Sequence, residues 1–112
     1  MSRTFELPEV GQIVEILRGR DRGAFAVVIG HAADRYVLIA DGDKRKAENP
    51  KKKNVLHLRK MQQASQDVAD AVAREGRVTN AKLRYAMHQF ELLHGEKTDE
   101  GSQEGGLPYG EG

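Results

Sequence analysis

The sequence predicts a mainly β fold with an α appendage: a small barrel of five short strands, then a helical hairpin and a disordered acidic tail. β-Branched and apolar runs of strand length occupy residues 12–17, 24–29 and 36–40. The hydrophobic period changes to that of a helix near Ser65. From Gly95 onward, six glycines in eighteen residues leave no apolar periodicity, so this tail cannot bury enough surface to offset its ordering entropy.

The connection between the first two predicted strands is a basic turn, residues 18–23, which we call the hairpin tip. It reads Arg18-Gly-Arg-Asp-Arg-Gly23, with a glycine on either side of the central triplet. Glycine adopts positive φ without a steric penalty, so Gly19 and Gly23 are predicted to let the chain turn tightly between antiparallel strands. Arg18, Arg20 and Arg22 should then point outward, where guanidinium groups suit phosphate oxygens. The alternative is a solvated turn that Asp21 partly neutralises.

The remaining strands follow from turn signals. Residues 30–35 are long enough for a hairpin loop, and Asp41-Gly42-Asp43 predicts a turn after the third strand. Residues 44–48 are predicted to form a short fourth strand that ends at Asn49-Pro50. Residues 55–58 can form the closing strand or a 3-10 turn. Five short strands in about sixty residues fit a closed or half-closed barrel, which hides most strand edges.

A second basic cluster follows the third strand. It holds six cations within ten residues: Lys44, Arg45, Lys46, Lys51, Lys52 and Lys53. Contact with an RNA backbone is the functional interpretation, and a flexible lysine-rich loop is the alternative. The sequence leaves open whether this cluster shares a face with the hairpin tip.

Two helices are predicted after the strands. The first starts near Ser65, and Gly76 is well placed to end it. The second opens at Thr79 or Asn80; with Thr79 as the cap, Val78 and Leu83 form a hydrophobic staple. An apolar stripe then runs along it through the positions Leu83, Ala86, Met87, Phe90, Leu93 and His94.

Charge is segregated along the chain, although the formal net charge is only +1. Residues 1–60 hold 13 Lys and Arg against 8 Asp and Glu, whereas residues 61–112 hold 5 against 9. This asymmetry indicates a polyanionic partner for the first part of the chain. No signal peptide or membrane span is recognisable, so we expect a cytoplasmic protein.

The sequence offers little for catalysis or metal binding. Cysteine is absent, and the four histidines show no metal-ligand spacing. No arrangement of serine, histidine and carboxylate residues typical of a catalytic site is recognisable. A phosphate-binding Gly-rich loop that ends in Lys-Ser or Lys-Thr is also absent. We therefore expect no enzyme, no metal and no cofactor.

The segment from Gly11 to residue 60 resembles the KOW motif of ribosomal proteins and transcription elongation factors. The likeness is carried by Gly11, Gly19, Gly23, Val27, residues 36–46, residues 49–54 and His57-Leu58. It is closer to the KOW proteins of the archaeal and eukaryotic large ribosomal subunit, and closer still to short bacterial KOW-domain RNA-binding proteins. Ala26 stands where many KOW motifs have glycine, which is compatible with the ribosomal subgroup.

The resemblance implies an SH3-like barrel over residues 1–60, to which we add a helical hairpin over 61–95 and a disordered Gly/Glu-rich tail over 96–112. It further implies a ribosomal or ribosome-associated, translation-related protein that contacts RNA backbone through basic loops, as part of a ribonucleoprotein. Ribosomal proteins or RNA polymerase are further candidate partners. The competing class is a protein-interaction module that docks through the helical hairpin. If Leu83, Met87 and Phe90 are buried against the barrel, that interpretation loses its main surface.

Overall fold

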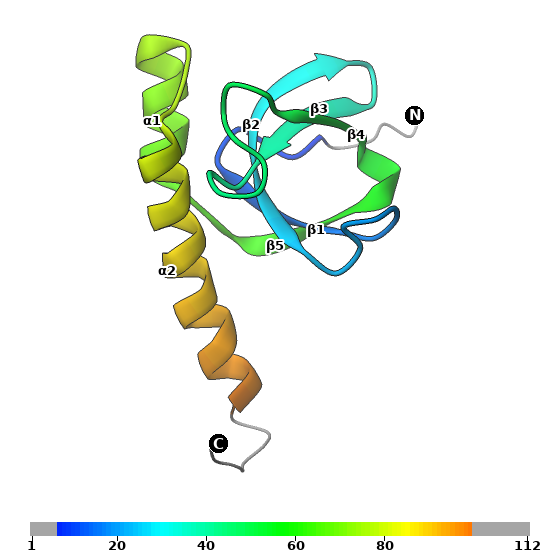
Figure 1. Cartoon of the computed structure of the whole chain (residues 1–112), viewed down its shortest axis with the longest axis vertical. Helices are drawn as coiled ribbons and strands as arrows, with labels where there is room; N and C mark the ends of the chain where they lie inside the picture. Colours follow the sequence, from blue (N-terminus) through cyan, green and yellow to red (C-terminus); the bar gives the residue numbers. More distant parts are fainter. Residues whose placement is uncertain (1–6, 100–112) are drawn as a thin grey trace, which may run out of the picture.

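The computed structural model describes residues 7–99. In this part of the chain, five strands precede two helices, and a short 3-10 helix, η1, separates the last two strands (Figure 1). The elements are β1 (Gln12–Ile16), β2 (Phe25–Ala33), β3 (Tyr36–Ala40), β4 (Lys51–Asn54), η1 (Val55–His57), β5 (Leu58–Ala64), α1 (Gln66–Glu75) and α2 (Asn80–Asp99). The predicted order, strands followed by a helical hairpin, is confirmed.

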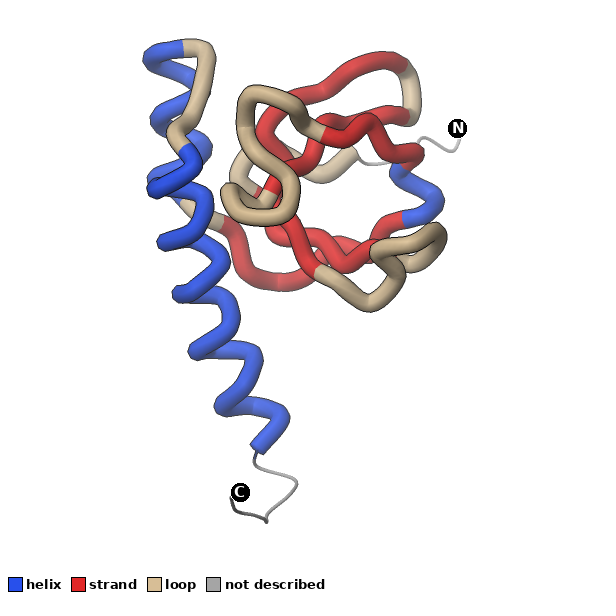
Figure 2. The backbone as a smooth tube through the Cα atoms, viewed as in Figure 1, coloured by secondary structure: helices blue, strands red, loops and turns tan. Residues whose placement is uncertain are grey.

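The strands form one antiparallel sheet in the order β4-β3-β2-β1-β5. Figure 2 shows that the sheet is strongly curved. Its edge strands, β4 and β5, are linked by η1, and no ladder between them closes the described sheet. The Val55 N–H donates to the carbonyl of Arg35, in the turn between β2 and β3 (2.7 Å). The Leu17 N–H, just after β1, donates to the His57 carbonyl (2.8 Å), so η1 is bonded at both of its ends. The described sheet is therefore open and not closed by strand pairing, where the sequence predicted a closed or half-closed barrel.

The central strands carry buried side chains on both faces of the sheet, which explains why the first part of β2 is a continuous apolar run instead of an alternating one. The inner cluster comprises Val14, Ile16, Ala26, Val28, Val37, Ile39 and Leu58. Residues of β3 and β5 share this cluster because the curvature brings separated strands together. The outer cluster comprises Ile13, Val27, Ala40, Val68, Val78, Leu83, Ala86 and Phe90. It lies between the other face of the sheet and the two helices.

The fourth strand lies at Lys51–Asn54 and not at residues 44–48, so that prediction was wrong. Residues 44–48 belong to a loop in which the Asp41 carboxylate accepts hydrogen bonds from the N–H groups of Asp43 and Arg45, both at 2.9 Å. Such a side-chain bond gives the backbone a partner other than a strand. The lysine-rich segment is extended because it pairs with β3. Tertiary pairing here overrides the low strand propensity of lysine.

The helix boundaries follow the predicted caps. The Ser65 hydroxyl accepts from the Val68 N–H, and Gly76 ends α1 with φ of 77°. The Thr79 hydroxyl accepts from the Lys82 N–H at 3.1 Å, so Thr79 caps α2. Three other boundaries differ from prediction: β2 extends to Ala33, into the expected hairpin loop at 30–35, β5 extends to Ala64, past the expected barrel end at residue 60, and α2 extends to Asp99, past residue 95. The rest of the predicted tail, residues 100–112, lies outside the described residues.

The helices pack on the sheet through the predicted stripe. Leu83 and Phe90 are buried, and Met87 packs against them at the edge of the outer cluster. The Phe25 ring of β2 lies 4.8 Å from the Phe90 ring, and His94 stacks on Phe90 with a centroid distance of 5.0 Å. Leu83 and Phe90 are thus covered by the molecule's own sheet, whereas Leu93, farther along the stripe, is 52% exposed. The protein-interaction interpretation loses the surface on which it was based.

The loop between β3 and β4 is fastened to the start of α2 by Asn80. The Asn80 side-chain carbonyl accepts from the Ala47 N–H at 2.7 Å, and its amide donates to the Glu48 carboxylate at 3.0 and 3.1 Å. The bond from Asn80 holds the pKa of Glu48 below its usual value, because it favours the charged carboxylate. One side chain therefore links residues that lie more than thirty positions away in sequence.

Replacing Asn80 by alanine is expected to lower the free energy of unfolding by about 1–2 kcal/mol, since the Ala47 N–H loses its partner. The Asn80–Glu48 contribution should be present above the carboxyl's unfolded pKa and lost as pH falls through the lowered folded pKa. Urea denaturation at neutral and acidic pH measures both effects. Asn49→Ala, an exposed change in the same loop, is the control. Equal losses in the two variants would contradict the assigned role of Asn80.

Candidate nucleic-acid interface

The hairpin tip has the predicted geometry. Gly19 and Gly23 adopt φ of 98° and 92°, in the left-handed region that favours glycine. The Gly23 N–H donates to the Ile16 carbonyl at 2.7 Å, and the Ala24 N–H donates to the Asp21 carbonyl at 2.9 Å. These bonds hold a compact turn. Its three arginines, Arg18, Arg20 and Arg22, are all exposed.

The second basic cluster is divided between a loop and a strand. In the loop, Lys44 and Lys46 are exposed, and Arg45 is half-buried with a guanidinium N–H donated to the Asn49 carbonyl at 3.2 Å. On β4, Lys51 and Lys53 pair with Ile39 and Val37, whose side chains belong to the inner cluster. Because side chains alternate along a strand, Lys52 lies on the opposite face. There its ammonium is 5.3 Å from the centre of the Tyr36 ring.

Lys53 joins the two basic clusters. Its ammonium donates to the Arg18 carbonyl at 3.0 Å, a contact between residues 35 positions apart. The structure therefore brings the hairpin tip and β4 to one rim of the sheet. The sequence had left open whether the two basic clusters share a face. Lys53 itself is half-buried and holds the tip in place. Lys52 does not take part in this rim.

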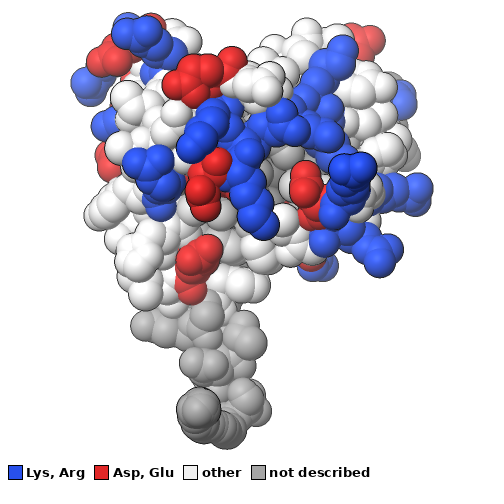
Figure 3. Space-filling model, in the orientation of Figure 1, with Lys and Arg blue, Asp and Glu red and all other residues white. Residues whose placement is uncertain are grey.

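Between the clusters lies a small cavity of about 170 Å³, which we call the basic hollow. Its apolar lining comes from Ile16, Ala24, Phe25, Ala26, Ile39 and Ala40, and its polar rim from Asp21, Asp41, Lys44, Arg45, Lys51 and Lys53. Figure 3 shows Lys and Arg side chains gathered over the sheet region of the molecule, with acidic side chains among them. The rim thus combines positive charge with a few carboxylates over an apolar floor.

A second cavity, of about 390 Å³, adjoins the basic hollow on the side of α2. The two share Ala24, Phe25, Asp41 and Lys44 in their linings. Arg84 of α2 donates to the Gly42 carbonyl at 3.0 Å, and exposed His88 lines the same cavity. Arg84 therefore fastens the loop to the helix.

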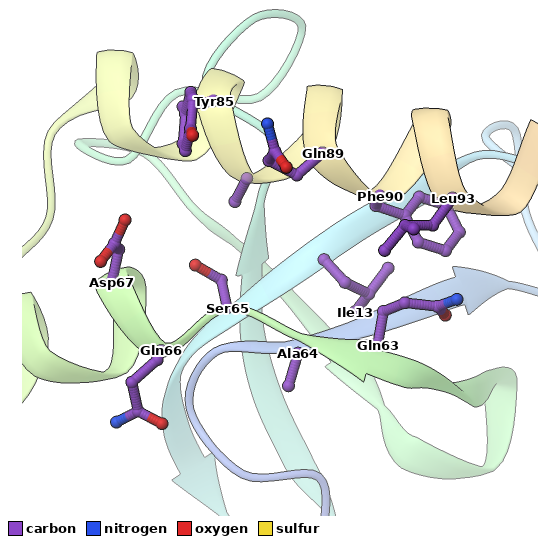
Figure 4. Close-up of a pocket in the computed structure, with 11 residues that line it drawn as sticks. Ile13, Gln63, Ala64, Ser65, Gln66, Asp67, Tyr85, Gln89, Phe90 and Leu93 are labelled. Atoms are coloured by element: carbon purple, nitrogen blue, oxygen red, sulfur yellow. The ribbon is translucent and has the colours of Figure 1, made fainter.

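A groove of different character lies on another side of α2. It has a volume of about 450 Å³ and is lined by β5, the start of α1 and α2, without any lysine or arginine. Figure 4 shows Tyr85, Gln89, Phe90 and Leu93 along the helix, facing Ile13, Gln63 and Ser65. Tyr85 and Leu93 are more than half exposed, at 56% and 52%. This groove suits an apolar partner and not a polyanion.

Within residues 7–99, His, Cys, Asp and Glu side chains form no group of three or more that could hold a metal ion. Neither described helix combines the length and apolar character that crossing a bilayer requires.

Three features of the site could not be predicted from the sequence. Phe25 packs against the outer cluster, yet it is half-buried and also lines both cavities. Asn80 was considered only as a helix cap, and its long-range bonds to Ala47 and Glu48 carried no sequence signal. The hydrogen bond from Lys53 to the Arg18 carbonyl also carried no sequence signal, because it depends on the pairing of distant strands.

The chain was compared with known proteins. No family model matches it. It is 37% identical over 71 residues to a protein of Bacillus subtilis (strain 168) that is named "Putative ribosome-binding protein YbzG". The match covers 63% of this chain and 96% of the Bacillus protein.

Proposed function

Because the chain belongs to the same family as the Bacillus subtilis protein YbzG, we propose that it binds the ribosome by contacting ribosomal RNA through its basic rim. The role is non-catalytic and needs no cofactor. The KOW assignment, with an SH3-like barrel, is part of this proposal. A ribosomal partner is consistent with the expected location in the cytoplasm.

One observation carries the RNA part of the proposal: the bond from Lys53 to the Arg18 carbonyl, which assembles the two basic clusters on one rim. Exposed arginines and lysines at a rim can each neutralise a phosphate, and the phosphate backbone dominates the affinity of proteins for nucleic acids. The interface residues that we propose are Arg18, Arg20, Arg22, Lys44, Arg45, Lys46 and Lys51, with Lys53 as a positioning residue. Lys52 is the weakest candidate because it lies on the other face.

Aromatic stacking of consecutive bases is poorly supported by this surface. Tyr36 is partly exposed but lies beside Lys52, away from the rim. Structured RNA, recognised through phosphates and 2′-hydroxyl groups, fits a basic rim better than a long single strand.

The proposal is tested by co-sedimentation of the full chain with ribosomes and, separately, with ribosomal RNA freed of protein. Binding to both at low salt, with release from both as salt rises, is expected because phosphate contacts displace counterions. Binding to ribosomes but not to the freed RNA would favour a protein partner. The groove beside α2, with Tyr85 and Leu93 exposed, would then be the candidate surface.

A further inference from the structure

We propose that the basic hollow receives a single unpaired nucleobase, so that the RNA recognised is a bulge or loop and not a continuous duplex. This inference rests on the proposed RNA-binding function and specifies its ligand.

The dimensions and floor of the hollow fit one aromatic ring system. Its volume of about 170 Å³ is below the roughly 300–1,000 Å³ of pockets for drug-sized ligands. Its floor is formed by buried apolar side chains, among them Ile16, Ala26 and Ile39 of the inner cluster. Ala24 and Phe25 form the wall toward α2. A flat, largely apolar base can cover this floor and exclude water from it.

The rim suits the remainder of a nucleotide. Lys44, Arg45 and Lys51 line the hollow, and their cationic groups can face the phosphates on either side of an inserted base. Asp21 and Asp41 belong to the same lining, and a carboxylate accepts hydrogen bonds from the amino or imino groups of a base edge. An inorganic phosphate would leave the floor uncovered. An apolar peptide would bury the cations without partners.

A continuous duplex cannot use the hollow. Its bases remain stacked, and it presents only phosphates, 2′-hydroxyl groups and a shallow minor groove to a protein. Extruding a base from a stack costs free energy, and the cost is least where the nucleotide is already unpaired. The hollow should therefore discriminate between RNAs that have the same number of phosphates but differ in one unpaired nucleotide.

The test compares two RNA hairpins that are identical except for one bulged nucleotide in the stem of the first. The full wild-type chain is expected to bind the bulged hairpin about 10-fold more tightly than the paired one. This ratio is toward the lower end of the affinity gained when a protein side chain stacks on one base. Ala24→Leu, which places a larger side chain in the wall of the hollow, should reduce this ratio to about 1 without changing the affinity for the paired hairpin. Ala33→Leu, at the exposed end of β2 and outside the linings of both cavities, should keep the wild-type ratio.

The outcomes separate the inference from the function on which it rests. Equal wild-type affinity for the two hairpins overturns the inference and leaves RNA binding intact, and this measurement requires no variant. A folded Ala24→Leu protein that keeps the 10-fold preference also overturns it, because the base must then bind elsewhere. Failure to bind either hairpin overturns the proposed function together with the inference. Thermal melting of both variants shows that they are folded.

Discussion

Removing the three arginines of the hairpin tip, by Arg18→Ala, Arg20→Ala and Arg22→Ala together, is expected to flatten the salt dependence of RNA binding by roughly two units. Each phosphate contact contributes about 0.7–0.9 to the slope of log affinity against log salt. At low salt the affinity should fall roughly 100-fold if each arginine contributes about 1 kcal/mol. The loss should be similar for every RNA tested, since phosphate contacts carry little sequence information. Affinities at several salt concentrations measure both quantities.

The matched control removes the same charge from another part of the surface. Arg74, Arg77 and Lys82 are exposed and lie around the turn that joins α1 to α2. Their replacement by alanine lowers the net charge by three, as the tip variant does, and should change the slope little. Both triple variants should keep the wild-type melting temperature to within a few degrees, because their side chains are in solvent. Equal slopes in the two triple variants would mean that the tip does not contact phosphate.

Gly42→Ala is expected to lower the free energy of unfolding by about 2–5 kcal/mol. Gly42 has φ of 83°, and an added Cβ would lie 2.5 Å from the Asn80 carbonyl oxygen and 2.9 Å from the Leu83 Cβ. Left-handed backbone costs a non-glycine residue about 1–2 kcal/mol, and overpacking against fixed atoms adds about 1–3 kcal/mol. Small domains have only about 5–15 kcal/mol in total. Urea denaturation of the full chain measures the loss.

Gly23→Ala separates these two contributions. Gly23 has φ of 92°, but its added Cβ would meet no atom within 4 Å. Only the backbone strain remains, so the expected loss is about 1–2 kcal/mol. If Gly42→Ala costs no more than Gly23→Ala, the loop of residues 41–49 does not pack on α2 as described. Gly42→Ala should also weaken RNA binding, because Lys44 and Arg45 are carried by this loop.

The sequence was sufficient for the local features of this protein. Apolar runs located β1, β2 and β3, because a strand with both faces buried needs apolar residues at successive positions. Ser65, Gly76 and Thr79 marked helix ends through side-chain and backbone chemistry that acts within a few residues. Gly19 and Gly23 of the hairpin tip likewise predicted positive φ, because this preference of glycine is also local. Arg18, Arg20 and Arg22 could therefore be predicted to be exposed.

Features that depend on partners distant in the chain were decided by the tertiary structure. Lysines 51–53 form a strand because β3 offers an unpaired edge, which outweighs their low strand propensity. Lys53 reaches Arg18, and Asn80 reaches Ala47 and Glu48, only after the sheet has curved and α2 has packed on it. The basic hollow arises from that same assembly, since its lining comes from β1, β2, β3, β4 and two loops. Periodicity and caps report short-range geometry, whereas a hydrogen bond across more than thirty residues leaves no trace in the local pattern of a single sequence.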